Sequence, residues 1–493
     1  MRNLSKSKLM AFRQCPRRVW LEVHRPGLKA DTQATEQSYQ TGYSVGEVAR
    51  KLYDPQGMGV TLDVDTVGFP AVFDATQQLL PKRRPLFEAA FQMPGALALA
   101  DVLLPQGQGW RMVEVKSSTS VKDVQLDDIA VQTHIARQSG LNLKSVAIAH
   151  VNNDWVYPGE QDYQGLLTEV DVSEQTFARA SEAQQWILDA QSIVARTEMP
   201  EVRTGAQCGQ PYACGFHNHC ASLEPQAEMP LQWLPRFRAQ PWVERGVLDM
   251  RALPDDALNP VQQRVRDCTA RGEIFFDRHG ATQALAEHPL PGYFLDFETI
   301  QFAVPIWAGT RPYQQIPFQW SLHFLTPEGT LDHVEFLDLS GRDPSKRFAE
   351  SLIAQCGKHG PVFVYNAAFE KTRIRELAER FPALAKALQA IDLRIVDLLP
   401  IARAYYYHPS QKGSWSIKAV LPAIAPELSY DNLNGVQDGG MAQEAFLEAI
   451  APQTAQPRKV DLRRQLLEYC KRDTLAMVRL WEVFSGEDPR AAA

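Results

Sequence analysis

The sequence predicts a mixed α/β protein with two domains, at residues 1–222 and 289–493, and a helical connector at 223–288. In both outer parts, short apolar runs typical of strands alternate with longer segments of helical periodicity. The chain has 493 residues, which is long enough for two separate hydrophobic cores. The connector is interrupted by prolines and has scattered apolar positions, which favours short helices.

The composition is that of a globular protein, with 45% hydrophobic and 22% charged residues. The net charge of −7 indicates no overall preference for nucleic acid, so such binding must use local basic patches, for example the Lys- and Arg-rich segment 1–30. No apolar run reaches membrane-spanning length, and the N-terminus lacks the apolar core of a signal peptide. We therefore expect a cytoplasmic protein without membrane contact.

Residues 97–104 and 110–115 are predicted to form two neighbouring strands that carry charged side chains among apolar ones. Asp101 ends the apolar part of the first strand, and Glu114 and Lys116 share one face of the second. Two carboxylates that meet at one point would hold Mg²⁺ or Mn²⁺, and the metal would acidify a water molecule. Lys116 would orient that water or offset charge on a scissile phosphate.

Two more residues extend this predicted site. The segment 127–140 has the pattern of a helix that carries Gln132 and ends at Gly140. Upstream, Glu88 would add a third acid. A lone Glu-x-Lys is usually a solvated strand edge, but an Asp on the preceding strand and a helix after it favour a metal site.

The seven cysteines of a cytoplasmic protein are expected to be reduced thiols or metal ligands. One near the N-terminus and three in a polar loop, with five residues in each gap, are the candidates for metal ligands: Cys15, Cys208, Cys214 and Cys220. Thiolates suit both an iron–sulfur cluster and zinc. His217 and His219 lie inside the late group, so a zinc site stays open.

The strongest catalytic signal is the stretch Gly292–Thr299, a predicted buried strand with Asp296 and Glu298 on one face. Two carboxylates side by side repel each other unless a hard cation lies between them. A bare Asp-x-Glu is usually a pair of solvated acids, so the interpretation depends on whether later parts of the chain add further acids.

Two later segments add further acids and a tyrosine. Glu370 comes after a second predicted buried strand, at 361–365. A predicted helix at 462–483 carries Tyr469 and Asp473, which lie four residues apart and so on one face. This order of acids and tyrosine resembles that of a two-metal 3′→5′ exonuclease. The other elements predicted in this domain are strands at 317–324 and 334–337 and helices at 346–360 and 417–424.

Residues 1–220 resemble the RecB-type branch of the PD-(D/E)xK nucleases, in particular members with an iron–sulfur cluster such as the CRISPR-adaptation nuclease and the AddB helicase-nuclease subunit. The matching positions are Cys15-Pro-Arg-Arg, Asp101, Glu114-Val-Lys116, Gln132 and the three late cysteines. The resemblance implies a restriction-endonuclease-like fold and a [4Fe–4S] cluster on Cys15, Cys208, Cys214 and Cys220.

This first match has departures. A histidine of the family falls on Gly46, the late cysteines are usually spaced x2 and then x5, and Ala136 stands where the family has Tyr. One metal ligand is therefore missing, and a domain that binds nucleic acid without cutting it stays open.

Residues 289–493 resemble the Tyr-containing branch of the DEDD exonucleases, which have an RNase H-like fold. The matching motifs are Asp296-x-Glu298, Asn366-x2-Phe369-Glu370 and Tyr469-x3-Asp473, with Glu370 where the family has Asp. The resemblance implies that Asp296, Glu298, Glu370 and Asp473 hold two Mg²⁺ or Mn²⁺ ions and that Tyr469 positions the attacking water. Both halves together, with the runs 317–323 and 413–418, also resemble a bacterial family of unassigned function.

These features predict a metal-dependent nuclease that releases nucleoside 5′-monophosphates from 3′ ends. Single-stranded DNA is the favoured substrate, although no residue that would read a 2′-hydroxyl is identifiable. Trp415 would offer a stacking surface for bases, and the segment 243–253 faintly resembles helix-hairpin-helix segments that bind the DNA backbone. The alternative is a nucleic-acid-binding scaffold with a degenerate N-terminal nuclease fold.

Overall fold

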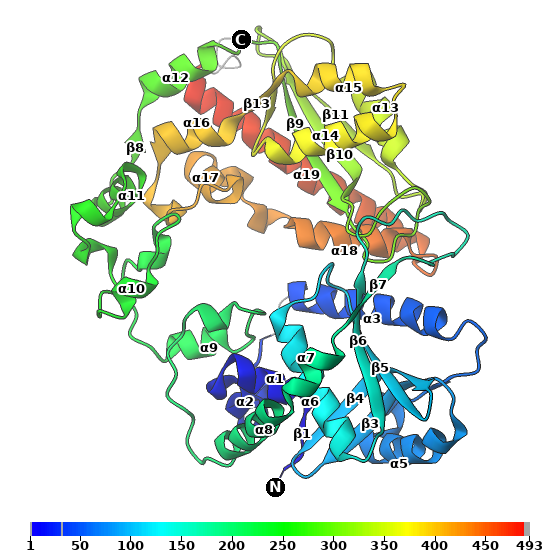
Figure 1. Cartoon of the computed structure of the whole chain (residues 1–493). Helices are drawn as coiled ribbons and strands as arrows, with labels where there is room; N and C mark the ends of the chain where they lie inside the picture. The colour runs from blue at the N-terminus through cyan, green and yellow to red at the C-terminus, as the bar shows by residue number, and fades with distance from the viewer. Residues whose placement is uncertain (1, 31–32, 488–493) are drawn as a thin grey trace. The chain divides into compact units, whose positions relative to one another are not determined.

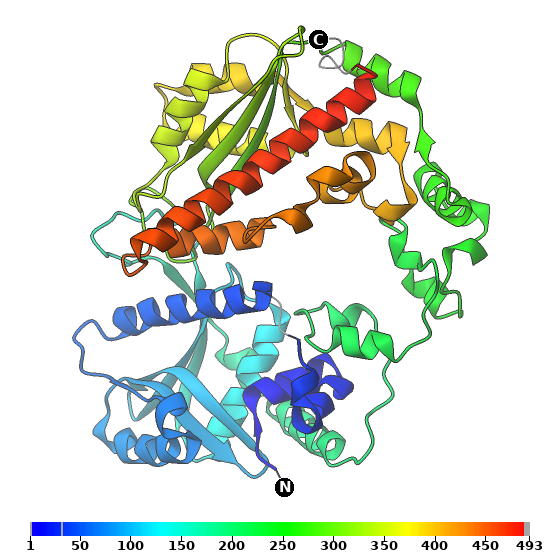
Figure 2. The same ribbon diagram turned by 180° about the vertical axis from the view of Figure 1, so that it is seen from behind.

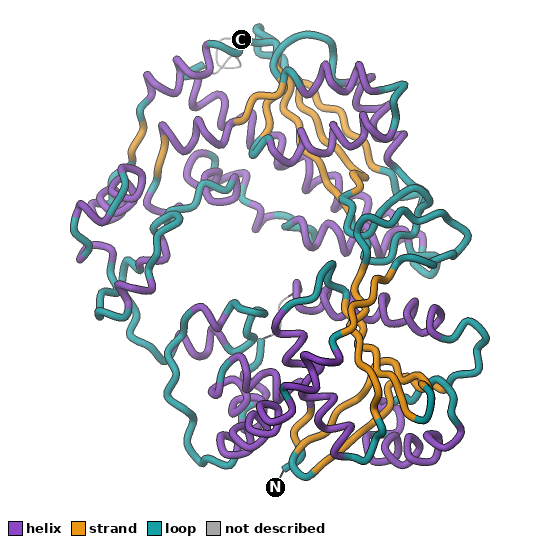
Figure 3. Tube along the Cα trace, in the orientation of Figure 1, coloured by secondary structure: helices purple, strands orange, loops and turns teal. Residues whose placement is uncertain are grey.

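The computed structural model describes residues 2–30 and 33–487 and has the mixed α/β character that the sequence predicts (Figure 1, Figure 3). The chain divides into two compact units. The first contains Met1–Pro225 and Phe302–Gln314, and the second contains Gln226–Gln301 and Gln315–Ala493.

The first unit is built on a seven-stranded mixed sheet with the order β2-β3-β4-β5-β6-β7, in which β1 pairs with β4. Its strands are β1 (Leu4–Ser5), β2 (Val60–Thr61), β3 (Leu86–Met93), β4 (Ala96–Gln106), β5 (Gly109–Lys116), β6 (Leu143–Val151) and β7 (Leu167–Asp171). Strands β4 and β5 are antiparallel neighbours, as the sequence predicts, and this pairing brings Asp101 close to the end of β5.

The helices of this unit are α1 (Lys6–Gln14), α2 (Pro16–His24), α3 (Gln33–Tyr53), α4 (Val64–Val67), α5 (Phe69–Leu79), α6 (Asp123–Gln138), α7 (Ser173–Ala178), α8 (Ala180–Val194) and α9 (His217–Ser222). Helix α6 starts before the predicted residue 127, because the side chain of Gln125 accepts the backbone N–H of Lys122 at 3.0 Å and so caps the helix start. It ends before Gly140, as predicted, and this glycine has a φ of +90° that few other residues adopt. Helices α1, α6 and α8 pack against the core of the sheet.

The segment Phe302–Gln314 comes after β9 in the chain but packs in the first unit. Ala303 lies in a small apolar cluster with Val45, Val151 and Leu166. The hydroxyl of Tyr313 donates a hydrogen bond to the carbonyl of Ser117, directly after Lys116. The sequence assigned this segment to 289–493, because a connection between two strands normally stays with its own sheet.

The second unit contains a five-stranded sheet with the order β11-β10-β9-β12-β13 and a two-stranded sheet of β8 and β14. The strands are β8 (Phe275–Phe276), β9 (Gly292–Ile300), β10 (Ile316–Leu325), β11 (Leu331–Leu337), β12 (Val362–Val364), β13 (Ile395–Asp397) and β14 (Tyr406–Tyr407). Strand β9 lies in the middle, antiparallel to β10 and parallel to β12.

The helices of this unit are α10 (Gln240–Val243), α11 (Pro260–Arg271), α12 (Arg278–Ala286), α13 (Ser345–Gln355), α14 (Ala368–Arg380), α15 (Ala385–Asp392), α16 (Leu398–Tyr405), α17 (Ile417–Ile424), α18 (Gly439–Ile450) and α19 (Gln456–Ser485). Figure 2 shows α19 lying along one face of the sheet. Helices α13, α14 and α15 pack against the core on the other face.

The side chains of β9 alternate between the two faces of the sheet, as predicted. Phe294 packs with Trp481 of α19, whereas Leu295 and Phe297 belong to the core under α13 and α14. Asp296 and Glu298, which alternate in step with Phe294, therefore face α19. Helix α13 ends at Gln355, earlier than the predicted 360, because the chain turns through two glycines of positive φ soon afterwards.

Within residues 2–30 and 33–487, none of the helices combines the length and the apolar character that crossing a membrane requires.

Candidate functional site

The tightest acidic cluster in the described part of the chain lies between β9 and α19. Asp296, Glu298 and Asp473 each offer one carboxylate oxygen, and these oxygens lie within 4.8 Å of one another. Glu298 is 9% and Asp473 8% exposed. Oxygens at such separations are compatible with ligands of one hard cation, since Mg²⁺ binds oxygen at about 2.1 Å. The structure thus brings together the first and third predicted motifs.

The electrostatics of this cluster show an unbalanced negative charge. Burial raises the pKa of Glu298 to about 8, and the neighbouring Asp473 adds to the shift. Burial also raises the pKa of Asp473 to about 6, although a hydrogen bond from Tyr430 opposes it. The pKa of Asp296 is raised well above its usual value by burial and then by Asp473 and Glu298. A divalent cation would remove this repulsion.

Glu370, the acid of the second predicted motif, lies in the first turn of α14. It is 2% exposed, and its Oε2 is buried without a hydrogen-bond partner among the described residues. Burial raises its pKa to about 8. The negative charge of Glu370 contributes to the rise in the pKa values of Asp296 and Glu298. The carboxylate of Glu370 is not part of the group of oxygens that lie within 4.8 Å of one another. Its longer side chain is thus near the cluster without joining the tight group.

The loop that leads to Glu370 is held by an aspartate. Asp397, the last residue of β13, accepts hydrogen bonds from the backbone N–H groups of Asn366 (2.9 Å) and Ala367 (3.0 Å). Asn366 has a φ of 73°, a left-handed conformation that asparagine tolerates better than most residues. These bonds fix where α14 begins and so where Glu370 points.

Tyr469 lies one helical turn before Asp473 and is 5% exposed. Burial raises its pKa far above the usual value, and the carboxylates of Asp473 and Glu298 raise it further. The phenol therefore keeps its proton at neutral pH and remains a hydrogen-bond donor. The adjacent thiol of Cys470 contacts Asp296 Oδ2 at 3.7 Å.

Two residues of this site were missed as site residues in the sequence. The hydroxyl of Tyr430 donates a hydrogen bond to Asp473 Oδ1. The ammonium of Lys418 lies 5.1 Å from the ring centre of Tyr430 and 5.2 Å from that of Tyr469. Its positive charge partly offsets the rise in the pKa values of Glu298 and Asp473. Lys418 ends the run 413–418, which the sequence singled out only for a resemblance.

The expectation that Trp415 offers a stacking surface is wrong. Its side chain is 4% exposed, and its indole N–H donates to the carbonyl of Tyr406 at 2.8 Å. An aromatic residue in a polar loop gave no sign of this burial, which results from packing against Tyr407.

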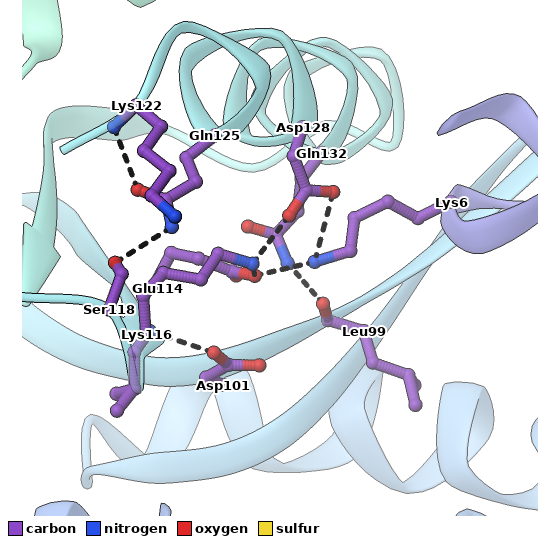
Figure 4. Close-up of polar contacts among 11 residues, drawn as sticks. Lys6, Leu99, Asp101, Glu114, Lys116, Ser118, Lys122, Gln125, Asp128 and Gln132 are labelled. Carbon is purple, nitrogen blue, oxygen red and sulfur yellow. Dashed lines mark hydrogen bonds and ion pairs between the residues drawn. The ribbon is translucent and has the colours of Figure 1, made fainter. Parts of the chain in front are cut away.

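A second cluster lies in the first unit, between β5 and α6, and is shown in Figure 4. Glu114 Oε1 accepts hydrogen bonds from the ammonium groups of Lys116 and Lys6, each at 2.7 Å. Lys116 also binds Asp128 Oδ2 at 2.6 Å. Burial by itself raises the pKa of Glu114, but Lys116 and Lys6 hold it below its usual value. The sequence placed Lys6 only in the basic segment 1–30, and Asp128 had not been identified.

The other predicted residues of this site differ in how close they lie to Glu114. Asp101 Oδ2 accepts the N–H of Val115 at 2.8 Å, and burial and Glu114 raise the pKa of Asp101 to about 7. Gln132 donates to the carbonyl of Leu99, so its amide supports β4. Glu88 has a φ of 58°, and within the described residues it does not join Asp101 and Glu114 in a group of oxygens within 4.8 Å.

The four candidate cysteines line one small cavity in the first unit, together with Arg17, Arg203 and His217: Cys15, Cys208, Cys214 and Cys220. Burial raises the pKa of Cys220, and Arg17 opposes this shift. In the described part of the chain, no three of these sulfurs lie within 4.8 Å of one another. Thiolates around one tetrahedral zinc would be about 4 Å apart, so the arrangement is wider than a closed zinc site.

Part of the chain matches a family model that has no assigned role. Residues 293–416 match the model described as "Domain of unknown function (DUF2779)". The matched region contains Asp296, Glu298 and Glu370 and stops before α19.

Two curated proteins are similar to part of the chain. The "Uncharacterized protein MG366 homolog" of Mycoplasma pneumoniae is 29% identical over 210 residues, which cover 38% of this chain and 31% of that protein. The "Uncharacterized protein MG366" of Mycoplasma genitalium is 26% identical over 208 residues, with the same coverage of 38% and 31%. The chain thus spans less than a third of the length of these relatives.

Proposed function

We propose that this chain is a metal-dependent nuclease whose second unit removes nucleotides from 3′ ends, with single-stranded DNA as the favoured substrate. The observation that carries the proposal is the group formed by Asp296, Glu298 and Asp473, whose oxygens lie within 4.8 Å of one another. These acids come from a central strand and a helix far apart in the chain. Their raised pKa values support a site that is completed by cations.

The side chains have separate tasks in this proposal. Asp296, Glu298 and Asp473 would hold Mg²⁺ or Mn²⁺, with Glu370 as a further ligand from α14. A bound cation would supply Lewis-acid chemistry that polarises a phosphoryl oxygen and acidifies water. The protonated hydroxyl of Tyr469 would hold the attacking water, because its raised pKa keeps it a donor.

The test is a digestion of 5′-labelled single strands. With Mn²⁺ the purified chain should produce a ladder of strands shortened from the 3′ end, and EDTA should stop the reaction. A closed circular strand, which has no end, should stay intact. Asp296→Asn should remove the activity, whereas Asp332→Asn, which changes an exposed acid on β11, should leave it. Full digestion by Asp296→Asn would refute the proposal.

The first unit supports a second candidate function, as a module that holds nucleic acid without cutting it. The specific observation is that Glu114 shares one oxygen between two lysines, so its charge is already compensated inside the protein. Gly46 also offers no side chain where a ligand was expected. In an Asp296→Asn background, residual cleavage of flaps or duplex ends that disappears with Lys116→Ala would instead assign cleavage to this unit.

We also propose that Cys15, Cys208, Cys214 and Cys220 hold a [4Fe–4S] cluster, with zinc as the alternative. Their shared cavity supports a common metal site, and the distant Cys15 in a RecB-like pattern favours the cluster over zinc. Protein purified without air should be brown, and Cys15→Ser should remove the colour while Cys268→Ser does not. Colourless protein with one zinc ion per chain would give the site to zinc.

A further inference from the structure

Lys6 lies inside the N-terminal cluster, although 108 residues separate it from Glu114 and none of the predicted motifs contains it. It is the first residue of α1, and its side chain extends toward β5 (Figure 4). Its ammonium is 2.7 Å from Glu114 Oε1 and 3.4 Å from Asp128 Oδ1. Lys116 contacts the same Glu114 oxygen and the other oxygen of Asp128. Two cations and two anions thus alternate in one network.

The network uses only one side of the Glu114 carboxylate. The Glu114 side chain is 2% exposed, and its Oε1 accepts both ammonium groups. Its Oε2 is buried and has no hydrogen-bond partner among the described residues. A buried carboxylate oxygen without a partner is costly, and this indicates a ligand that the protein itself does not supply.

Asp101 is the second acid that such a ligand would meet. One of its oxygens accepts the N–H of Val115, which leaves the other for a cation. That hydrogen bond, from the residue next to Glu114, places the Asp101 carboxylate beside the end of β5. Mg²⁺ and Mn²⁺ are commonly held by one or two carboxylates, with water completing the shell, so Asp101 and Glu114 fit one such ion.

We infer that Lys6 is a functional residue of this site: its ammonium takes the side of Glu114 where a second cation would bind, so the site accepts a single divalent cation at Asp101 and Glu114 Oε2. Two-metal sites place their ions about 4 Å apart, and an ammonium 2.7 Å from Glu114 excludes a second ion from that side. Because like charges repel at this range, Lys6 also weakens the binding of the ion that is admitted. The inference rests on the metal site that the sequence predicts at Asp101 and Glu114, and it is independent of the exonuclease site.

The experiment measures Mn²⁺ binding to the full chain in an Asp296→Asn/Asp473→Asn background, which removes the acidic cluster of the second unit. Free Mn²⁺ is monitored by its electron paramagnetic resonance signal. We expect about one bound ion per chain, lost in Glu114→Gln. Lys6→Met should lower the Kd of this ion by about tenfold or more, because a nearby positive charge is removed. Lys6→Arg, which keeps the charge, should leave the Kd within about twofold.

Lys8→Met is the matched control, because Lys8 lies on the same helix and makes no ion pair with any residue that the structure describes. Its Kd should equal that of the background. Absence of a Glu114-dependent ion, two such ions with Lys6 intact, or an unchanged Kd in folded Lys6→Met would each overturn the inference. The first two outcomes need no change at Lys6, so they decide the matter even where Lys6→Met does not fold. None of them depends on the exonuclease assay.

Discussion

The two acidic clusters of this chain are both buried, but they balance their charge in different ways. In the first unit, Glu114 contacts two ammonium groups at 2.7 Å, and its pKa is held below the usual value. In the second unit, Glu298 has acids as its close neighbours and Lys418 as an opposing charge, and its pKa rises to about 8. The same type of side chain is shifted in opposite directions, because its neighbours differ.

Buried carboxylates therefore do not by themselves specify a strong metal site. A cluster that lysines neutralise binds a divalent cation more weakly, whereas an unbalanced cluster is relieved of repulsion when the cation binds. The balanced network should also contribute to the stability of the fold when all its members are present. The unbalanced one lowers the stability of the metal-free protein, so single substitutions in the two clusters should have opposite effects.

The largest expected effect is on catalysis by the second unit. Asp473→Asn removes an acid of the tight group and should lower the rate of 3′ digestion by about a thousandfold. Asp128→Asn removes a buried acid of the balanced cluster and should leave this rate unchanged. Single-turnover digestion of a 5′-labelled strand measures both. Equal losses in the two variants would contradict the assignment of catalysis to the second unit.

Breaking the balanced network should mainly cost stability. Lys116→Met leaves Asp128 and Glu114 buried with one ammonium fewer, and we expect the free energy of unfolding of the first unit to fall by about 3 kcal/mol. Urea denaturation, monitored by proteolysis within residues 2–225, measures the change. The exposed Lys144→Met is the control. An unchanged midpoint would show that these ion pairs add nothing to the fold.

Neutralising an acid of the unbalanced cluster should instead raise the free energy of unfolding. Because the pKa of Glu298 in the folded protein, about 8, lies above its ordinary 4.5, the folded state binds more protons than the unfolded state between these values. The stability of the metal-free protein should therefore fall as pH rises from about 5 to 8. Glu298→Gln should reduce this slope and stabilise the protein at pH 8 by about 2 kcal/mol.

Thermal unfolding in EDTA and in Mn²⁺ provides the measurement for Glu298. Bound Mn²⁺ should flatten the pH dependence of the parent protein, because it favours the ionised carboxylates. A parent protein whose metal-free stability rises between pH 5 and pH 8 would contradict the charge imbalance described for this cluster.

The smallest effect is expected for Tyr469→Phe, which removes a hydroxyl but leaves the acids in place. Its raised pKa keeps this hydroxyl a donor, so its loss should lower the rate by about tenfold without changing Mn²⁺ affinity. Tyr430→Phe is a useful comparison, since that hydroxyl binds Asp473 and its loss should change metal affinity as well. Rates measured at saturating Mn²⁺ distinguish the two tyrosines.

The local patterns of the sequence were sufficient for the elements that carry the acids. Alternation predicted a buried strand at Gly292–Thr299 and the common face of Asp296 and Glu298, and helical spacing put Tyr469 and Asp473 on one face. These periodicities are set by the backbone geometry of strands and helices, so they can be read without knowledge of the fold. Element ends were less certain, as at α13, because glycine conformations decided them.

Which charges oppose each acid depends on the packing of elements that are distant in the sequence. Lys6 and Asp128 are distant from Glu114 in sequence and became visible only when α1 and α6 packed against β5. Lys418 and Tyr430 likewise reach Asp473 from other segments. The ionisation of a buried carboxylate depends on all charges within a few ångströms, and such distances are fixed by packing between elements. The position of each acid along the chain can therefore be read from the sequence, whereas the fold determines which of these acids are already neutralised.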